Sequence, residues 1–162
     1  MTLPTLVLLL ARLERLNETL VSGVCRSHDL SASELRVLAM LHHRAVDGRV
    51  SPSRLADWIV QTSGGLTATL RRLEEAGYIV RGDDPADGRG RLVQITDGGR
   101  EFYSTVFGEL IRRYGVALRG VDQEAALGTV RGLIAALEAS EGSGRTGDWT
   151  TIAPEKMAAR SP

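Results

Sequence analysis

The chain has 162 residues, of which 43% are hydrophobic and 4% aromatic, so it is long enough to form one compact domain. Its 20 basic residues balance its 20 acidic ones, which excludes the overall basic excess that is typical of nucleic-acid-binding proteins. The single cysteine excludes an internal disulfide, as expected of a cytoplasmic protein.

The first predicted element is an N-terminal helix with a stripe of leucines. The residues of this leucine stripe recur at helical spacings of 3 and 4, and they are Leu6, Leu9, Leu13, Leu16 and Leu20. The spacing alone fits a core within the chain as well as it fits a contact between two subunits. Arg12, Glu14 and Arg15 end the apolar run far short of the roughly 20 residues that span a membrane. We therefore expect neither a membrane helix nor an export signal.

Cysteine and histidine are the residue types in the N-terminal third that could carry chemistry. We interpret Cys25 as an inert, half-buried thiol, with oxidant sensing as the alternative, because only Arg26 is close enough in sequence to lower its pKa. His28, His42 and His43 are the only histidines. Adjacent side chains on a helix point in different directions, so His42 and His43 make a poor metal-binding pair, and we expect no metal site.

A second helix is predicted from a capping box formed by Ser31 and Glu34. It runs to about Arg44, and its inner face would consist of Leu35, Leu38 and Leu41. A turn follows, after which Val50 is expected to form a brief third strand beside the hairpin described next.

Two short helices are predicted after Ser51. Ser51-Pro52 is a typical helix start, and apolar residues at helical spacing predict a helix over 52–60. Ser63 is then expected to cap a helix over 63–77, whose inner face consists of Leu66, Leu70 and Leu73. Gly77 ends this helix in the left-handed conformation that glycine tolerates best.

A β-hairpin is predicted after these helices. Residues 78–80 begin a strand, and residues 92–95 return after a turn over 82–90. The turn is rich in Asp and Gly and cannot build a core, and its acids lack the spacing of a calcium-binding loop. Helix, turn, helix and hairpin together predict a winged helix-turn-helix.

The outer face of helix 63–77 is the first candidate binding surface. Its small residues would let the backbone approach a DNA groove, and Arg71 could reach a guanine edge or a phosphate. An isolated amphipathic helix would be interpreted as merely solvated on this face, but the preceding helix and the following hairpin favour DNA binding. The predicted DNA-binding residues here are Thr62, Ser63, Gly64, Thr67, Ala68 and Arg71.

The residues from about 55 to 100 resemble the MarR family of dimeric winged-helix transcriptional regulators. The resemblance rests on three patterns, Leu73-Glu74-x-x-Gly77-Tyr78-Ile79-x-Arg81, Asp84-Pro85-x-Asp87-x-Arg89 and Ile95-Thr96-x-x-Gly99-Arg100. It extends more loosely from about Leu6 to Leu137. It implies a mainly α fold with a two-stranded wing and with N- and C-terminal dimerisation helices.

The resemblance also assigns roles in the wing. It implies that Asp87 holds Arg89 so that Arg89 enters the DNA minor groove. Independently of the resemblance, we expect Arg91 to contact a backbone phosphate. Gly88 stands where many family members have another arginine, so this wing would grip DNA with one guanidinium fewer.

Two more helices are predicted after Thr96, one to about Arg119 and one over roughly 122–139, and Gly120 separates them. In the resembled family these helices join the first one in building the dimer. The expected organisation is one domain over 1–139, with dimerisation helices at 1–28 and 97–139 and the DNA-binding part at 31–96. Residues 140–162 lack periodicity and are expected to form a flexible tail.

The predicted function is a sequence-specific DNA-binding regulator, a ligand-responsive repressor that binds a palindromic operator in double-stranded DNA as a homodimer. The resemblance implies a small aromatic or phenolic effector between the dimer helices and the winged part, where Trp58, Tyr103 and Phe107 fit packing as well as they fit a pocket. The alternatives are a protein-interaction module without DNA binding and a redox sensor acting through Cys25. The sequence contains no motif of a nucleotide-binding loop, nucleophile elbow or metal site, so we expect no enzymatic activity and no cofactor.

Overall fold

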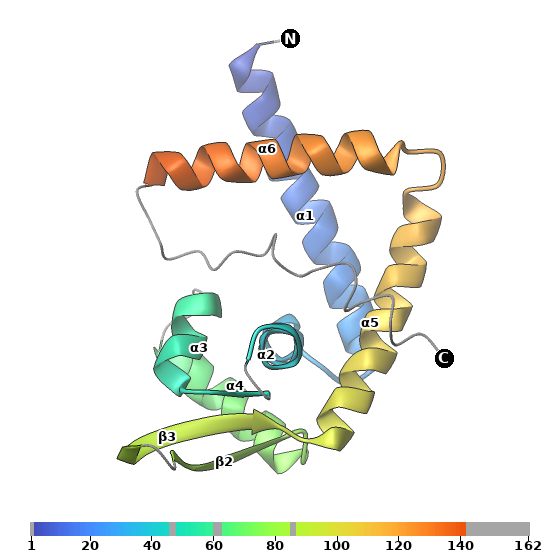
Figure 1. Ribbon diagram of the computed structural model, residues 1–162. Helices are drawn as coiled ribbons and strands as arrows, with labels where there is room; N and C mark the ends of the chain where they lie inside the picture. The colour runs from blue at the N-terminus through green and yellow to red at the C-terminus, as the bar shows by residue number, and fades with distance from the viewer. Residues whose placement is uncertain (1, 46–47, 60–62, 85–86, 142–162) are drawn as a thin grey trace.

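The computed structural model describes residues 2–45, 48–59, 63–84 and 87–141. In chain order the elements are α1 (Leu3–Ser27), α2 (Ala32–His43), β1 (Arg49–Val50), α3 (Pro52–Ile59), α4 (Ser63–Glu75), β2 (Ile79–Asp84), β3 (Asp87–Ile95), α5 (Asp97–Ala117) and α6 (Gln123–Glu141). The winged helix-turn-helix and the flanking terminal helices are thereby confirmed (Figure 1).

Helix α2 lies at the centre of the fold, between α3 and α4 on one side and α1 and α5 on the other (Figure 1). Its predicted capping box is present, because Ser31 Oγ accepts from the Glu34 backbone N–H at 3.2 Å and the Glu34 carboxylate accepts from the Ser31 backbone N–H at 2.7 Å. The predicted inner face is buried, and Val37 and Met40 are buried as well. Because helices pack on several sides of α2, its buried surface extends beyond the single face that the sequence predicted.

The two helices of the helix-turn-helix pack on α2 through short apolar faces. Leu55 and Ile59 of α3 are buried, as are the three predicted leucines of α4. Gly77 adopts φ of 76°, and the Tyr78 backbone N–H donates to the Leu73 carbonyl at 2.9 Å, which closes the end of α4 as expected for a glycine cap. The helix begins at Ser63, as the predicted range 63–77 has it, and ends at Glu75, two residues earlier than predicted.

The wing is part of a three-stranded antiparallel sheet with the strand order β1-β3-β2. Val50 pairs with Val93, which confirms the predicted third strand. The strands of the hairpin reach further than predicted, because Gly82 pairs with Leu92 and Asp83 with Arg91 inside the expected turn. Hydrogen bonds between the two strands satisfy the backbone N–H and C=O groups of these residues, although their side chains build no core.

Helix α5 begins against the end of α4. The Thr96 hydroxyl accepts from the Gly99 backbone N–H at 2.9 Å and donates to the Gly77 carbonyl at 2.8 Å. It thus caps α5 and ties the cap to the residue that ends α4. Gly120, with φ of 84°, follows the end of α5 as predicted.

The terminal helices present apolar side chains to solvent in the single chain. Leu9, Leu13 and Leu16 of the leucine stripe are 46%, 56% and 53% exposed. On α6 the exposed large apolar residues are Leu127, Val130 and Leu137. These three residues are therefore not part of a core within the described chain, whereas Leu20 at the end of the stripe packs against the core. None of the described helices combines the length and the apolar character that a membrane span requires.

Candidate nucleic-acid interface

The outer face of α4 forms a continuous exposed strip. Leu66, Leu70 and Leu73 anchor the helix in the core and so turn its other side outward. The predicted contact residues on that side, Gly64, Thr67, Ala68 and Arg71, are all exposed. Thr62 lies outside the described residues, and only the backbone of Ser63 is described, at the first position of the helix.

Arg71 is held only loosely on this strip. Its Nε lies 3.7 Å from the Glu75 carboxylate one helical turn further on, and the two side chains are 71% and 64% exposed. Surface pairs of this kind contribute about 0–1 kcal/mol, so a DNA group can replace Glu75 at small cost.

Acidic residues around α4 and the wing pair with arginines. Arg91 Nε lies 3.5 Å from Asp83 across the wing strands, with both side chains largely exposed. Arg81 Nε lies 3.1 Å from Glu74, although without hydrogen-bond geometry. These acids offset the local basic charge, but they also hold arginines in defined places. The balanced charge of the region is therefore compatible with anion contacts.

The wing brings the backbones of Asp87 and Arg89 into strand β3. Their side chains lie outside the described part of the chain, so the expected arrangement of Asp87 around Arg89 stays a prediction. Arg91, by contrast, is described, and its exposed side chain lies on β3 beside Asp83, towards the turn of the hairpin.

Sequence analysis missed an ion pair through which Glu34 positions α4. Glu34 is 7% exposed, and beyond its role in the capping box its second carboxylate oxygen lies 2.9 Å from Arg72 Nε. This ion pair joins the start of α2 to α4, on the residue next to Arg71. The capping-box pattern predicted Glu34 but gave no sign of Arg72, because the two residues are 38 positions apart in the sequence.

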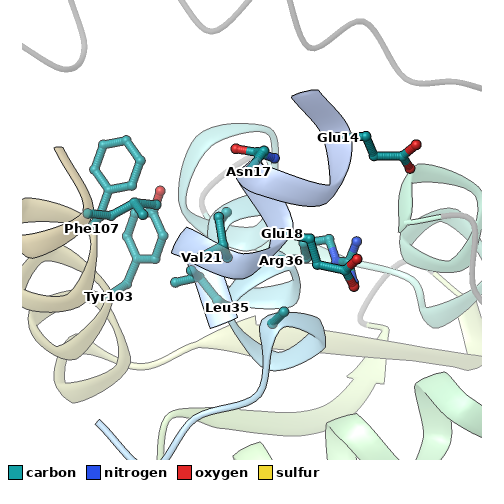
Figure 2. A pocket seen from close by; sticks show the side chains of 11 residues that line it. Glu14, Asn17, Glu18, Val21, Leu35, Arg36, Tyr103 and Phe107 are labelled. Carbon is teal, nitrogen blue, oxygen red and sulfur yellow. The ribbon is translucent and has the colours of Figure 1, made fainter. Parts of the chain in front are cut away.

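A cleft of about 350 Å³ lies between α1, α2 and α5. Figure 2 shows Tyr103 and Phe107 on one side of it and Glu18 and Arg36 on the other, with Val21 between them. The rings of Tyr103 and Phe107 stack at 5.4 Å between centroids. The sequence left open whether these two aromatic residues only pack or line a pocket, and the structure places both in the lining of this cleft.

Polar groups fix the aromatic side of this cleft. The Tyr103 hydroxyl is hydrogen-bonded to His43 Nε2 at 2.8 Å, and burial raises the pKa of Tyr103 above its usual range. Tyr114 donates to the Asn17 side-chain carbonyl, which links α5 to α1. Trp58 belongs to α3 and does not line this cleft. Its ring lies instead beside the guanidinium of Arg44, which follows the end of α2.

The chemistry considered for cysteine and histidine is not favoured by their surroundings. Cys25 is 1% exposed, deeper than the half-buried thiol we expected. Burial raises the pKa of the Cys25 thiol and Glu34 raises it further, which disfavours the reactive thiolate.

The two adjacent histidines correct a prediction. We expected His42 and His43 to point apart, but their rings lie 4.7 Å from each other and both pack near Tyr103, because α5 presents an aromatic surface to them. Among the described residues no group of three or more metal-binding side chains comes together.

Comparison with known proteins gives a consistent picture. A family model described as the MarR family matches residues 28–90. The HTH-type transcriptional regulator PecS of Dickeya dadantii (strain 3937) is 33% identical over 90 residues, which are 56% of this chain and 54% of PecS. The chain spans about half the length of the curated relatives it matches, and these are described as transcriptional regulators rather than enzymes.

Solved structures share the fold over most of the chain. Sco3205, a MarR family transcriptional regulator from Streptomyces coelicolor solved in complex with DNA, has a TM-score of 0.69 at 21% identity and covers 91% of this chain and 93% of its own. CouR from Rhodococcus jostii RHA1, solved with p-coumaroyl-CoA, has a TM-score of 0.69 at 21% identity and covers 80% of this chain and 88% of its own. At these identities the likeness establishes the fold.

Proposed function

We propose that this chain, which belongs to the MarR family, is a sequence-specific DNA-binding transcriptional regulator that acts as a homodimer. The observation that carries the proposal is the exposed strip of α4. A helix that buries three leucines and leaves Gly64, Thr67, Ala68 and Arg71 outward matches the shape and chemistry of a major groove. We therefore treat α4 as the recognition helix.

Homodimer formation is supported by the exposed apolar side chains of the terminal helices. Rows of exposed apolar side chains along helices favour association with another surface. A closed dimer has two-fold symmetry, so its two recognition helices would read half-sites about one turn of DNA, roughly 34 Å, apart. We therefore propose a palindromic operator and, as the simplest consequence of occupying it, repression.

The cleft between α1, α2 and α5 is proposed to bind the effector. It is lined by α1 and α5, which are proposed to form the dimer, and by α2, on which the recognition helix α4 packs. A ligand there could therefore favour one spacing of the two recognition helices over another. Tyr103 and Phe107 offer ring surfaces suited to a small aromatic or phenolic compound. CouR and NadR, two proteins of the same fold, were solved with p-coumaroyl-CoA and 4-hydroxyphenylacetate.

The experiment that tests the proposed function is binding of the purified protein to DNA upstream of its own gene and to random duplex, in a salt series. Selective binding that weakens steeply with salt is expected, because neutralised phosphates release counterions. Equal binding to both duplexes at every salt concentration, repeated on other candidate promoters, would remove the proposal.

Replacing Arg89 with alanine is expected to weaken operator binding by about tenfold or more, because each subunit would lose a minor-groove contact worth about 1–3 kcal/mol. Fluorescence anisotropy with labelled operator measures the affinity, and sedimentation checks that the dimer persists. Arg112→Ala, which removes an exposed arginine of α5 instead, is the matched control. Unchanged affinity in Arg89→Ala would show that the wing does not grip DNA through this residue.

Replacing Arg71 with alanine is expected to reduce the ratio of operator to random-DNA affinity by about tenfold, since a bidentate base contact contributes about 1–3 kcal/mol of discrimination. The measurement is anisotropy on both duplexes at one salt concentration. Equal loss on both would assign Arg71 to phosphate instead of base contact.

A second candidate is a winged-helix module that binds proteins instead of DNA, and the combination of balanced charge with exposed apolar terminal helices favours it. The salt series separates the two candidates, because protein contacts need not release counterions from a polyanion.

A further inference from the structure

A hollow of about 300 Å³ lies outside both the recognition helix and the effector cleft. The end of α2, strand β1, helix α3, and Asp84 and Leu92 of the wing strands enclose it. Three arginines line it, Arg44, Arg49 and Arg54, against one acidic residue, Asp84. Figure 1 shows α3 above the hairpin of β2 and β3, the two parts of the fold that line the hollow together with β1 and the end of α2.

Trp58 organises two of the three arginines. The guanidinium carbon of Arg44 lies 5.1 Å from the Trp58 ring centroid, and that of Arg54 lies 5.7 Å from it. Both distances are in the range of cation–π contacts. Arg49 is fixed separately, because its Nε donates to the Gln94 side chain at 3.0 Å.

Like several other arginines in the described part of the chain, these three have no carboxylate partner, but they alone are gathered around one hollow. Within that part, ion pairs involve Arg71, Arg72, Arg81, Arg91 and Arg113, and neither Arg44, Arg49 nor Arg54 forms one. Arg44 Nη1 is moreover buried without a hydrogen-bond partner. A buried unsatisfied donor costs about 1–3 kcal/mol, more when it is charged.

The chemistry of the hollow suits a phosphate. Arginine presents several N–H donors in a planar fork that matches phosphate oxygens, and a phosphate would relieve the repulsion among the three cations. Ser51, the residue that precedes α3, adds a hydroxyl to the lining next to the positive end of the helix dipole.

We propose that this arginine hollow is a phosphate-binding site whose occupant is a backbone phosphate of DNA. The proposal rests on the proposed function, which places α4 in a major groove and the wing in the adjacent minor groove. A sugar-phosphate strand separates two adjacent grooves, and the hollow is lined by α3, the first helix of the helix-turn-helix, and by Asp84 and Leu92 of the wing, which the proposed complex brings to that strand. None of these three arginines belongs to the contact residues predicted from the sequence.

The first test uses Trp58 as a reporter in the full chain. Replacing Trp149 with phenylalanine leaves Trp58 as the single tryptophan. Titration with inorganic phosphate at constant ionic strength, with chloride as the reference anion, is expected to change Trp58 fluorescence saturably. Arg54→Gln should weaken the response at least fivefold, Arg54→Lys should restore part of it, and Arg112→Gln should leave it unchanged. No saturable change, or an equal change in Arg54→Gln, would overturn the site.

The second test decides the source of the phosphate. Each lost phosphate contact lowers the slope of log affinity against log salt by about 0.9, so Arg54→Gln in both subunits should lower it by about 2. The loss should be the same on operator and random duplex, because a backbone contact carries no sequence information. An unchanged slope combined with a fluorescence response to phosphate would overturn DNA as the occupant in favour of a free phosphate compound.

The outcomes separate this site from the proposed function. If the protein fails to select any operator but phosphate still changes Trp58 fluorescence and Arg54→Gln abolishes the change, the regulator proposal fails and the phosphate site stands. If operator selection is intact but Arg54→Gln alters neither readout, the phosphate site fails alone. Circular dichroism confirms that the variants fold, and Arg54 suits the test because its side chain is exposed on α3.

Discussion

Replacing Leu13 with glutamate is expected to convert the proposed dimer into monomers and to weaken operator binding by about 100-fold or more. Leu13 is 56% exposed in the single chain and lies in the leucine stripe between Leu9 and Leu16. In a dimer that buries this stripe, the carboxylate would lose its water without gaining a partner, a cost of several kcal/mol. A monomer binds only one half-site. It therefore loses the high effective concentration that a dimer gains for its second recognition helix once the first one is bound.

Sedimentation velocity measures the assembly state, and anisotropy measures the affinity for operator. Ala11→Glu is the matched control, because it adds the same charge to the same helix on the face turned away from the stripe. We expect this control to remain dimeric. Monomers with a folded winged part are the anticipated product of Leu13→Glu, since this side chain contributes little to the core of its own chain. A Leu13→Glu protein that stays dimeric would show that the subunits meet through another surface.

Replacing Gly99 with alanine is expected to lower the free energy of unfolding by about 3 kcal/mol or more, at the upper end of what overpacking costs. A Cβ atom at this position would lie 2.1 Å from the Tyr78 carbonyl oxygen and 2.9 Å from its carbonyl carbon. The obstacle is backbone, and it is fixed, because the Tyr78 carbonyl accepts from the Thr96 backbone N–H at 3.0 Å and from the Thr96 hydroxyl at 3.1 Å. Neither group can retreat without opening the start of α5.

Gly98→Ala is the control for this substitution. A Cβ atom there would have Thr96 Oγ1 as its nearest described neighbour, at 3.9 Å, which is ordinary contact. Alanine is a better helix former than glycine, so this variant is expected to be as stable as the original or more stable by about 0.5–1 kcal/mol. Urea unfolding at one fixed protein concentration compares the three proteins, because dimer stability depends on concentration. Equal midpoints for both variants would contradict the close approach of Gly99 to Tyr78.

Local patterns were sufficient to predict most elements of the winged helix. The capping box at Ser31, the leucines of α4 and the glycine at 77 each act within about one or two helical turns, so the sequence shows them directly. The extent of the wing strands was underestimated for the opposite reason. Pairing of Gly82 with Leu92 depends on two segments meeting, and a glycine- and aspartate-rich stretch gives no local sign of it.

By itself, the sequence determined the order of the helices, the hairpin, the outward face of α4 and the family resemblance, because periodicity, caps and turn residues are properties of neighbouring positions. Only the tertiary structure decided which charges meet and which are left without a partner. It paired Glu34 with Arg72, buried Cys25, and gathered Arg44, Arg49 and Arg54 around a hollow. These relations arise where helices and strands distant in sequence pack together, and there burial and Coulomb interactions, which act through space, select the partners.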